Sequence, residues 1–499
     1  MRQSLLPVLP ALRWSGDNGY GLEAPAVGRW LDQGAVGFIL FGGTAEGALE
    51  ASEWLRIRAG RPLLLGADLE RGVGQQFQGA TPLPPLAALA ADGRRERLFE
   101  AGELTGREAL AVGVPWVFAP VADLALEPRN PIVGTRSPGA EPVQVAEAVT
   151  AWIQGCLSAG ALPCVKHFPG HGRTLEDSHR TLPMVETDRK TLAATDLVPF
   201  RAAIAAGVPS VMTAHVAYPA LDASGRPATR SRPILTELLR GSMGFDGVVV
   251  TDALIMDGAG DPASSIVESL QAGVDLLLYP PGDLPARDIL EAAAAEGRLD
   301  PEERLRSLER VEGLLASVSG AGRGGEGGWG AERDRAGALR WAMECMDVAG
   351  EMSPRPGSIS LTVVDDDVGG PYPAPSRDVF PAVLREAGIE VTEVETGVKP
   401  EGASGGGGVV TAAPSSRGVG DLPLLCVYAE PRAWKGRAGL SAESRARIHA
   451  WAEKHRGWGT VVAFGGPTLR AELPPELPTL LAWGGEALMQ RAAAQRLFT

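Results

Sequence analysis

Residues 161–183 read Ala-Leu-Pro-Cys-Val-Lys-His-Phe-Pro-Gly-His-Gly-Arg-Thr-Leu-Glu-Asp-Ser-His-Arg-Thr-Leu-Pro. An apolar run of strand length ends abruptly at Lys166 and His167, and the Pro-Gly pair at 169–170 prevents regular structure after it. The loop that follows carries two more histidines and Asp177. Titratable groups that follow a buried strand are typical of an active site at the end of a parallel sheet.

Apolar runs like this one recur along the first part of the chain. There are eight of them, at residues 5–12, 35–41, 62–68, 115–119, 162–167, 209–215, 247–252 and 274–279. Strands of a parallel barrel are buried on both faces and therefore read as continuous apolar runs. The sequence thus predicts the α/β class, with a (β/α)8 TIM-type barrel.

Polar residues stand at the ends of several of these runs. They are Asp68, Lys166 with His167, His215, Asp252 and Tyr279. In a barrel these residues would converge on one mouth, which is where the active sites of this fold lie. Unrelated strands would have no reason to end repeatedly in polar groups, so the pattern predicts an enzyme.

The second part of the chain has a different composition. Glycine becomes frequent after Leu315, which is typical of a flexible linker, and alternating strand and helix patterns then predict a smaller α/β sandwich. We expect a catalytic barrel over 1–315, a Gly-rich linker and connecting helix over 316–350, and the sandwich over 351–499. A glycine run at 405–408 lacks the G-x-x-x-x-G-K pattern of a phosphate loop, and no cofactor is predicted.

Composition limits the partners. The net charge is −14, whereas nucleic acids and anionic membranes require a basic surface, so neither is expected as a partner. The four cysteines are scattered and none forms a C-x-x-C pair, so neither a zinc ribbon nor a disulfide framework is indicated. The first apolar run contains two prolines and is expected to be a strand rather than a signal peptide, which makes the cytoplasm the expected location. The oligomeric state cannot be inferred from the sequence.

Three interpretations of the 164–183 segment compete. A metal site could use His167, His171, Asp177 and His179, although the Pro-Gly pair breaks the helix that would bring the first two onto one face. A purely structural role would have these groups satisfy one another around a tight turn. The third interpretation is acid–base chemistry, in which Asp177 holds one ring nitrogen of His179 and the other nitrogen moves a proton near neutral pH.

An Asp–His pair of this kind needs a partner that attacks or stabilises. Asp252 is the candidate, because Val248-Val249-Val250-Thr251 delivers it to the mouth of the predicted barrel. His171 has no assigned role beyond a hydrogen bond that stabilises the turn.

The segment Lys166-His-Phe-Pro-Gly-His-Gly172 followed by Asp177-Ser-His179 resembles the signature of family 3 glycoside hydrolases of the β-N-acetylglucosaminidase (NagZ-like) branch. Further motifs of that family recur in order over most of residues 20–280. They are Gly37-Phe-Ile-Leu-Phe41, Asp68-x-Glu70, Phe118-Ala-Pro-Val-x-Asp123, Gly134-x-Arg136-Ser137, Ala214-His215 through Tyr218-Pro-Ala220, Gly244-Phe-x-Gly-Val248 and Thr251-Asp-Ala-Leu-x-Met256. The second domain is similar to the C-terminal domain of longer members, but more weakly.

The resemblance implies a retaining exo-β-N-acetylglucosaminidase. Asp252 would attack the anomeric carbon and form a covalent glycosyl-enzyme, while His179, held by Asp177, would protonate the leaving oxygen and then activate water. The substrate would be a carbohydrate, either a muropeptide or a chitin-type oligosaccharide. An imidazole repels an incoming anion less than a carboxylate does, so a phosphorylase that uses phosphate as acceptor is the first alternative. A metal-dependent barrel hydrolase is the second.

The resemblance also implies that Asp68, Arg136, Lys166 and His167 hold the sugar hydroxyls. A carboxylate acceptor with Arg and Lys donors suits a pyranose, and we favour ligand contact for Arg136 and Lys166 over the alternative of an ion pair inside the barrel with Asp68 or Asp123. This chain departs from the family at Gln76, where a basic residue is usual, and at Pro138, where Phe is common. These two departures concern the preference for the leaving group rather than the core chemistry.

Overall fold

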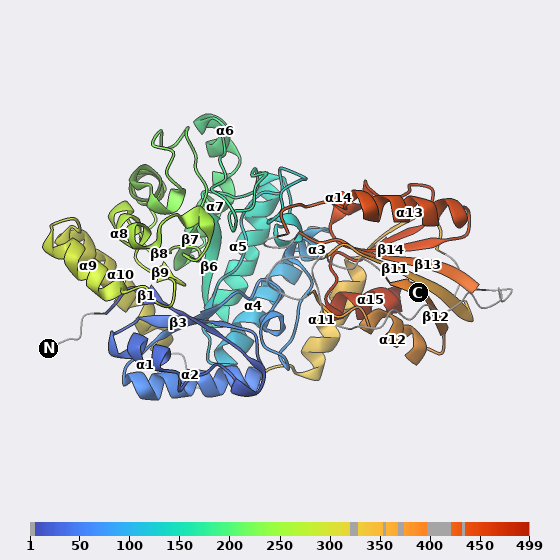
Figure 1. Ribbon diagram of the computed structural model, residues 1–499, viewed down its shortest axis with the longest axis horizontal. Coiled ribbons are helices and arrows are strands. Elements are labelled where there is room, and N and C mark those ends of the chain that lie inside the picture. The colour runs from blue at the N-terminus through green and yellow to red at the C-terminus, as the bar shows by residue number, and fades with distance from the viewer. Residues whose placement is uncertain are drawn as a thin grey trace. The chain divides into compact units, whose positions relative to one another are not determined.

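The computed structural model describes residues 5–319, 328–352, 356–367, 374–396, 421–431 and 435–498. By its internal contacts the chain divides into two compact units (Figure 1). The first comprises Met1–Leu83, Gly93–Glu127 and Ser137–Arg335, and the second comprises Pro84–Asp92, Pro128–Arg136 and Ala336–Thr499. Part of the predicted linker, residues 320–327, and the glycine run at 405–408 lie outside the described residues. The domain bounds at 315 and 350 therefore stay a prediction.

The strands of the first unit form a parallel barrel. They are β1 (Val8–Leu9), β2 (Ala11–Arg13), β3 (Gly37–Phe41), β4 (Leu64–Ala67), β5 (Trp116–Val117), β6 (Leu162–Phe168), β7 (Ser210–Thr213), β8 (Val248–Val250) and β9 (Leu277–Leu278). Strands β2 to β8 pair in chain order, a bridge joins Val250 to Leu276 beside β9, and β9 pairs with β1. Strands β1 and β2 both belong to the first apolar run, so the pairing of β9 with β1 closes the barrel. The predicted (β/α)8 fold is confirmed.

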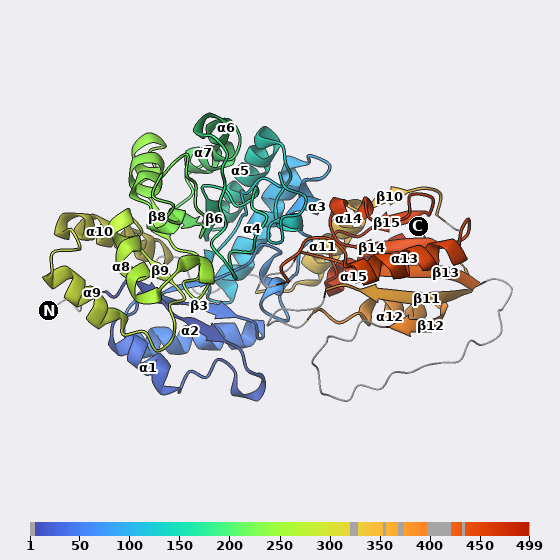
Figure 2. The same ribbon diagram turned by 45° about the horizontal axis from the view of Figure 1, so that its top comes forward.

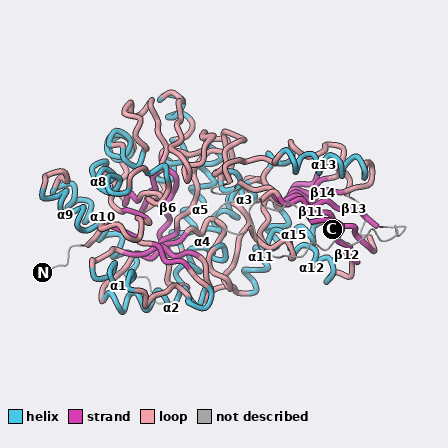
Figure 3. The backbone as a smooth tube through the Cα atoms, viewed as in Figure 1, coloured by secondary structure: helices cyan, strands magenta, loops and turns pink. Residues whose placement is uncertain are grey.

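Helices lie outside these strands (Figure 3). They are α1 (Pro25–Asp32), α2 (Ala45–Ala59), α4 (Arg95–Ala111), α5 (Pro142–Ser158), α6 (Arg189–Ala194), α7 (Leu197–Ala205), the π-helix Pro233–Ser242, α8 (Pro262–Ala272), α9 (Ala286–Ala295) and α10 (Pro301–Ser319). Helices α4 and α5 touch backbone to backbone. A Cβ at Gly102 would lie 2.0 Å from the Trp152 carbonyl oxygen, and one at Gly155 would lie 1.9 Å from that of Phe99. Glycine is required at both positions because of this close approach.

The interior of the barrel is filled by side chains of several strands. Ile39, Leu64, Trp116, Cys164 and Val250 belong to one buried cluster. The side chains of these strands therefore pack into one solid core.

The described residues of the second unit form one six-stranded sheet, in the order β10-β15-β14-β13-β11-β12. The strands are β10 (Asp347–Ala349), β11 (Ser358–Asp365), β12 (Glu390–Thr396), β13 (Asp421–Tyr428), β14 (Thr460–Phe464) and β15 (Thr479–Leu481). Only the pairing of β10 with β15 is antiparallel. Helices cover both faces of the sheet, as predicted for an α/β sandwich (Figure 2). The helices of this unit are α3 (Leu86–Ala90), α11 (Glu332–Glu344), whose first turn belongs to the first unit, α12 (Val379–Glu386), α13 (Ala442–Lys454), α14 (Pro467–Arg470) and α15 (Ala487–Arg496).

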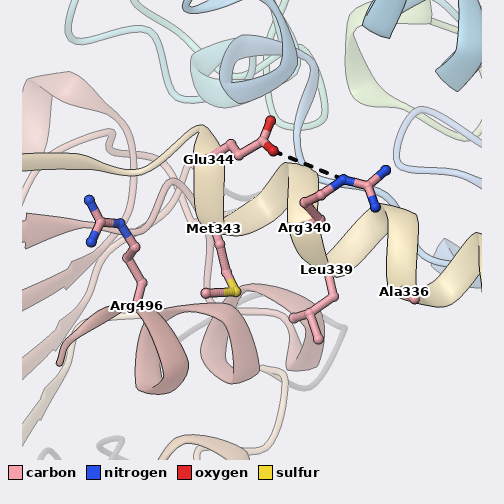
Figure 4. A pocket seen from close by; sticks show the side chains of 6 residues that line it. All are labelled: Ala336, Leu339, Arg340, Met343, Glu344 and Arg496. Atoms are coloured by element: carbon pink, nitrogen blue, oxygen red, sulfur yellow. Dashed lines mark ion pairs between the residues drawn. The ribbon is translucent and has the colours of Figure 1, made fainter. Parts of the chain in front are cut away.

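A shallow cavity of about 490 Å³ lies between α11 and α15 of the second unit (Figure 4). Its lining includes Leu339 and Met343 and the ion pair between Arg340 Nε and Glu344 Oε1, 4.0 Å apart. This cavity contains no cluster of acid–base groups, so the candidate active site lies elsewhere. Among the described residues, no helix is both long and apolar enough to cross a membrane.

Candidate active site

Lys166 lies in β6 and is held between two carboxylates. Its Nζ is 2.7 Å from Asp68 Oδ1 and 2.7 Å from Glu70 Oε1. The lysine side chain is only 2% exposed, whereas that of Asp68 is 30% exposed. Asp68 therefore keeps an accessible carboxylate face that can accept hydrogen bonds from a ligand, while Lys166 offsets its charge. Glu70 appeared in the sequence only as part of a motif, and its place beside Lys166 was not predicted.

His167 forms a pair with Asp123, which follows β5. The His167 Nδ1 is 2.6 Å from Asp123 Oδ2, and Asp123 Oδ1 accepts the backbone N–H groups of His167 (3.2 Å) and His171 (2.7 Å). Burial raises the pKa of Asp123, but the field and hydrogen bond of His167 outweigh burial, so the pKa lies below its ordinary value. Asp123 is thus an anion that fixes the orientation of the His167 ring and the start of the following loop.

The loop after β6 is held by its own side chains. His171 is buried, with Nδ1 2.9 Å from Thr174 Oγ1 and Nε2 2.9 Å from Ser178 Oγ. The Thr174 hydroxyl donates to the His171 carbonyl oxygen, so this hydroxyl accepts from Nδ1–H and the Ser178 hydroxyl donates to Nε2. Burial lowers the pKa of His171 to about 4, which keeps the ring neutral. His171 therefore binds two loop hydroxyls, in line with the turn-stabilising role expected for it.

Asp177 and His179 form a hydrogen-bonded pair in the same loop. Asp177 Oδ1 accepts the backbone N–H of His179 at 2.9 Å and lies 2.8 Å from its Nδ1. The Asp177 side chain is 2% exposed and that of His179 is 18% exposed. The buried carboxylate thus fixes the tautomer of a histidine that solvent or a ligand can reach.

Asp252 follows β8, and its Oδ1 accepts the backbone N–H of Ala253 at 2.7 Å. Burial raises its pKa, but the imidazoles of His167, His215 and His179 lower it, and the net pKa lies below the ordinary value. The carboxylate is therefore ionised at neutral pH.

His215 follows β7 and lies beside Asp252, although the sequence predicts no role for it beyond its position at a strand end. It is fully buried, with Nε2 3.2 Å from the Ala253 carbonyl oxygen and Nδ1 2.8 Å from Thr229 Oγ1. Its pKa is lowered, chiefly by burial. His215 thus holds the backbone beside Asp252 in place.

Gly258 connects the loop after Asp252 with the loop that carries the Asp177–His179 pair. Its N–H donates to the Ser178 carbonyl oxygen at 3.0 Å. A Cβ at this position would lie 2.8 Å from that oxygen and 2.9 Å from the Thr181 carbonyl oxygen. The two loops therefore approach each other through a residue that has no side chain.

Arg136 lies in Pro128–Arg136, a segment that belongs to the second unit. Its Nη1 is 3.4 Å from the Ile132 carbonyl oxygen. A Cβ at Gly134 would lie 2.4 Å from Pro431, and one at Gly466 would lie 3.1 Å from Thr135. The segment thus packs against loops that follow β13 and β14, and a sugar contact from Arg136 stays a proposal.

The structure also places the two residues that depart from the family pattern. Gln76 Oε1 accepts the backbone N–H of Gly42 at 3.0 Å, so its amide supports the loop after β3. Pro138 follows Ser137, whose hydroxyl donates to the Asp123 carbonyl oxygen at 2.6 Å. Within the described part of the chain, no group of three or more His, Cys, Asp or Glu side chains is arranged to hold a metal ion.

Comparison with known proteins decides the family. Residues 26–314 match the model of the glycosyl hydrolase family 3 N terminal domain, which is more than half of the chain. The protein belongs to glycosyl hydrolase family 3. It is a glycoside hydrolase, and its relatives bear this out.

A beta-hexosaminidase of Xylella fastidiosa (strain M23) is 38% identical over 321 residues, which is 61% of this chain and 94% of the relative. One of Thiobacillus denitrificans is 42% identical over 224 residues, 43% of this chain and 60% of the relative.

Solved structures extend the likeness to the whole chain of this family 3 protein. A family 3 beta-N-acetylglucosaminidase from Paenibacillus sp. str. FPU-7 is 27% identical with a TM-score of 0.82, and the match covers 99% of this chain and 96% of that one. A beta-glucoside phosphorylase, BglX bound to 2FGlc, also has a TM-score of 0.82 but is 19% identical, over 99% of this chain and 91% of that one. At that identity the second likeness concerns the fold alone.

Proposed function

We propose that this family 3 enzyme is a retaining exo-β-N-acetylglucosaminidase. The observation that carries the proposal is the Asp177–His179 pair, with its 2.8 Å bond, in a loop whose Ser178 carbonyl oxygen accepts from Gly258 of the loop after Asp252. A nucleophile must be anionic, and a general acid–base group needs one nitrogen fixed and the other available. The names of the relatives, beta-hexosaminidase and beta-N-acetylglucosaminidase, support the same chemistry.

In the proposed reaction, a carboxylate oxygen of Asp252 attacks the anomeric carbon and the glycosidic C–O bond breaks. The Nε2–H of protonated His179 gives its proton to the departing oxygen. Neutral His179 then takes a proton from a water that attacks the same carbon and releases Asp252. Asp177 stabilises the imidazolium that precedes the first transfer and is regenerated in the second.

Substrate binding is assigned to Asp68, Lys166, His167 and Arg136. The ionised Asp68, held by Lys166 at 2.7 Å, accepts hydroxyl protons, and the Lys, His and Arg groups supply donors. The substrate is a terminal N-acetylglucosamine of a muropeptide or of a chitin-type oligosaccharide.

A cytoplasmic location and a role in peptidoglycan recycling belong to the proposal. All four cysteines are buried, and Cys156, Cys164 and Cys426 are free thiols, which suits a reducing compartment. Fractionation of cells that produce the protein with its native N-terminal sequence tests the location. Activity in the periplasmic or secreted fraction would contradict a cytoplasmic location.

The second candidate function is a β-N-acetylglucosaminide phosphorylase. What favours it is that the proposed acid–base group is a histidine, because a neutral imidazole admits a phosphate anion beside the glycosyl-enzyme more readily than a carboxylate does. One structural neighbour is named as a phosphorylase of a different sugar.

These functions are separated by measuring the release of nitrophenol from nitrophenyl N-acetyl-β-glucosaminide in buffer with and without phosphate, and by identifying the sugar product. We expect turnover in phosphate-free buffer, N-acetylglucosamine as the product, and no activity in Asp252→Asn. Sugar 1-phosphate as the main product would establish the phosphorylase instead. Activity that a chelator abolishes and zinc restores would favour the metal-dependent hydrolase. An unaffected rate in Asp252→Asn would contradict the assignment of Asp252 as the nucleophile.

A further inference from the structure

Asp275 marks a charged cluster at the opposite end of the barrel from Asp252. It stands two residues before β9, and Arg240 of the same cluster donates to the carbonyl oxygen of Gly247, which directly precedes β8, whereas Asp252 follows the end of β8. The cluster is therefore at the amino ends of these parallel strands, and helices α8 and α10 belong to the same region (Figure 1). It is separate from the site proposed for sugar chemistry.

The Asp275 carboxylate is fully buried and its oxygens are already occupied. Oδ2 accepts from Arg240 Nη2 at 2.6 Å and from the backbone N–H of Val249 at 2.8 Å. Oδ1 accepts from Arg310 Nη2 at 2.8 Å. The carboxylate therefore already accepts from two arginines and a backbone N–H, and its charge is offset within the cluster.

A cavity of about 110 Å³ opens beside this cluster. Its charged lining consists of Arg240, Arg304, Arg306 and Arg310 against Asp275 and Glu303, so positive charges exceed negative ones by two. Glu303 is itself engaged by Arg232, at 2.7 and 3.2 Å. A water takes about 30 Å³ of liquid volume, so the cavity has room for a group of a few heavy atoms.

Two of the arginines carry donors that the protein does not use fully. The Arg240 Nε is buried without a hydrogen-bond partner. The side chain of Arg304, which is partly buried, has one hydrogen bond among the described residues, from Nη1 to Ser307 Oγ at the long distance of 3.5 Å. Burial lowers the pKa of both guanidinium groups, since their charge is costly there. Buried charge and unmet donors of this kind are stabilised by an anion.

We propose that this cavity binds a small tetrahedral oxyanion, namely phosphate or sulfate, either free or as the terminal group of a monoester. The Arg240 Nε and the guanidinium of Arg304 are donors that an oxyanion can accept from, and the excess of two positive charges in the lining matches the anion's charge. Because the cavity lies at the amino ends of the strands, this anion is not an acceptor for the sugar. The proposal is independent of the proposed function.

Calorimetric titration of the full chain with inorganic phosphate tests the site, with chloride at equal ionic strength as the blank. We expect saturable binding of one phosphate and a rise in Tm of about 3 °C or more at saturation. Arg304→Gln should lose at least about tenfold in affinity, because charge-assisted bonds to the anion are lost. Arg298→Gln is the matched control, since Arg298 pairs on the surface with Glu296 at 2.7 Å, and it should bind as the wild type does.

Binding that is absent from the wild type, or equal in Arg304→Gln and the wild type, would overturn the proposal. If Arg304→Gln does not fold, Arg304→Lys keeps the charge without the planar fork and should still weaken phosphate binding several-fold. Phenyl phosphate distinguishes a free phosphate ion from a phosphate monoester as the ligand. Competition with inorganic phosphate indicates that the site admits an ester, and failure to compete indicates that it takes the free ion. Loss of binding in Asp252→Asn would place the anion at the mouth and refute the assignment.

Discussion

At the scale of single residues, Asp177 is the group whose removal isolates acid–base chemistry. In Asp177→Asn the residue keeps its size but loses the charge that stabilises the imidazolium of His179. We expect kcat for the nitrophenyl substrate to fall by about 100-fold or more, with a smaller change in KM. Steady-state kinetics measure this. As a control, Glu176→Gln removes the exposed charge of the preceding residue and should leave kcat unchanged. Equal losses of kcat in the two variants would contradict the role of Asp177.

His171 makes a prediction about pH. Burial holds its pKa at about 4, below the unfolded value of about 6.5, so the unfolded chain binds the extra proton between these values. The stability that comes from the neutral ring is complete above about pH 6.5 and is lost as the pH falls toward 4.

Urea unfolding at pH 7.5 and pH 5 measures this effect. His171→Gln should lose less free energy of unfolding between the two conditions than the wild type, by about 2 kcal/mol. The exposed His449→Gln serves as the control and should follow the wild type. A drop in His171→Gln as large as that of the wild type would show that the ring is not held neutral.

At the scale of elements, the contact between two loops decides the position of the proposed catalytic pair. A methyl group at Gly258 would lie 2.8 Å from the Ser178 carbonyl oxygen, so Gly258→Ala pushes apart the loops that carry Asp252 and His179. We expect kcat to fall by about 10- to 100-fold, since small displacements of reacting groups are costly. Gly282→Ala is the control, because a Cβ there meets nothing within 4 Å. A normal kcat in Gly258→Ala would show that this contact does not position the pair.

At the scale of the whole molecule, the second unit supports the Arg136 segment. Gly134 and Thr135 pack against Pro431 and Gly466, so a chain that ends at residue 350 leaves this segment without those contacts. We expect such a shortened chain to show a KM raised by about tenfold or more, with kcat affected less, because a sugar-binding group is misplaced rather than the reacting groups. Circular dichroism checks that the barrel is folded. An unchanged KM would separate Arg136 from substrate binding.

The eight strand positions and the polar strand ends were predictable, because buried parallel strands are apolar throughout and end where the chain becomes polar. The residues that these polar strand ends contact were not predictable from the sequence. Lys166 meets Asp68 across 98 residues of sequence, and the further contact with Glu70 depends on how the barrel closes. The short strand β10 and the membership of Pro128–Arg136 in the second unit likewise arise from tertiary contacts, which no local pattern indicates.

The most direct test of the central claim is mass spectrometry of the protein after incubation with a slow fluorinated N-acetylglucosaminide. A retaining mechanism through Asp252 predicts a covalent sugar adduct on the peptide that contains Asp252, which is absent when Asp252→Asn is treated in the same way. Turnover of the substrate without any adduct, or an adduct on a different residue, would contradict the account.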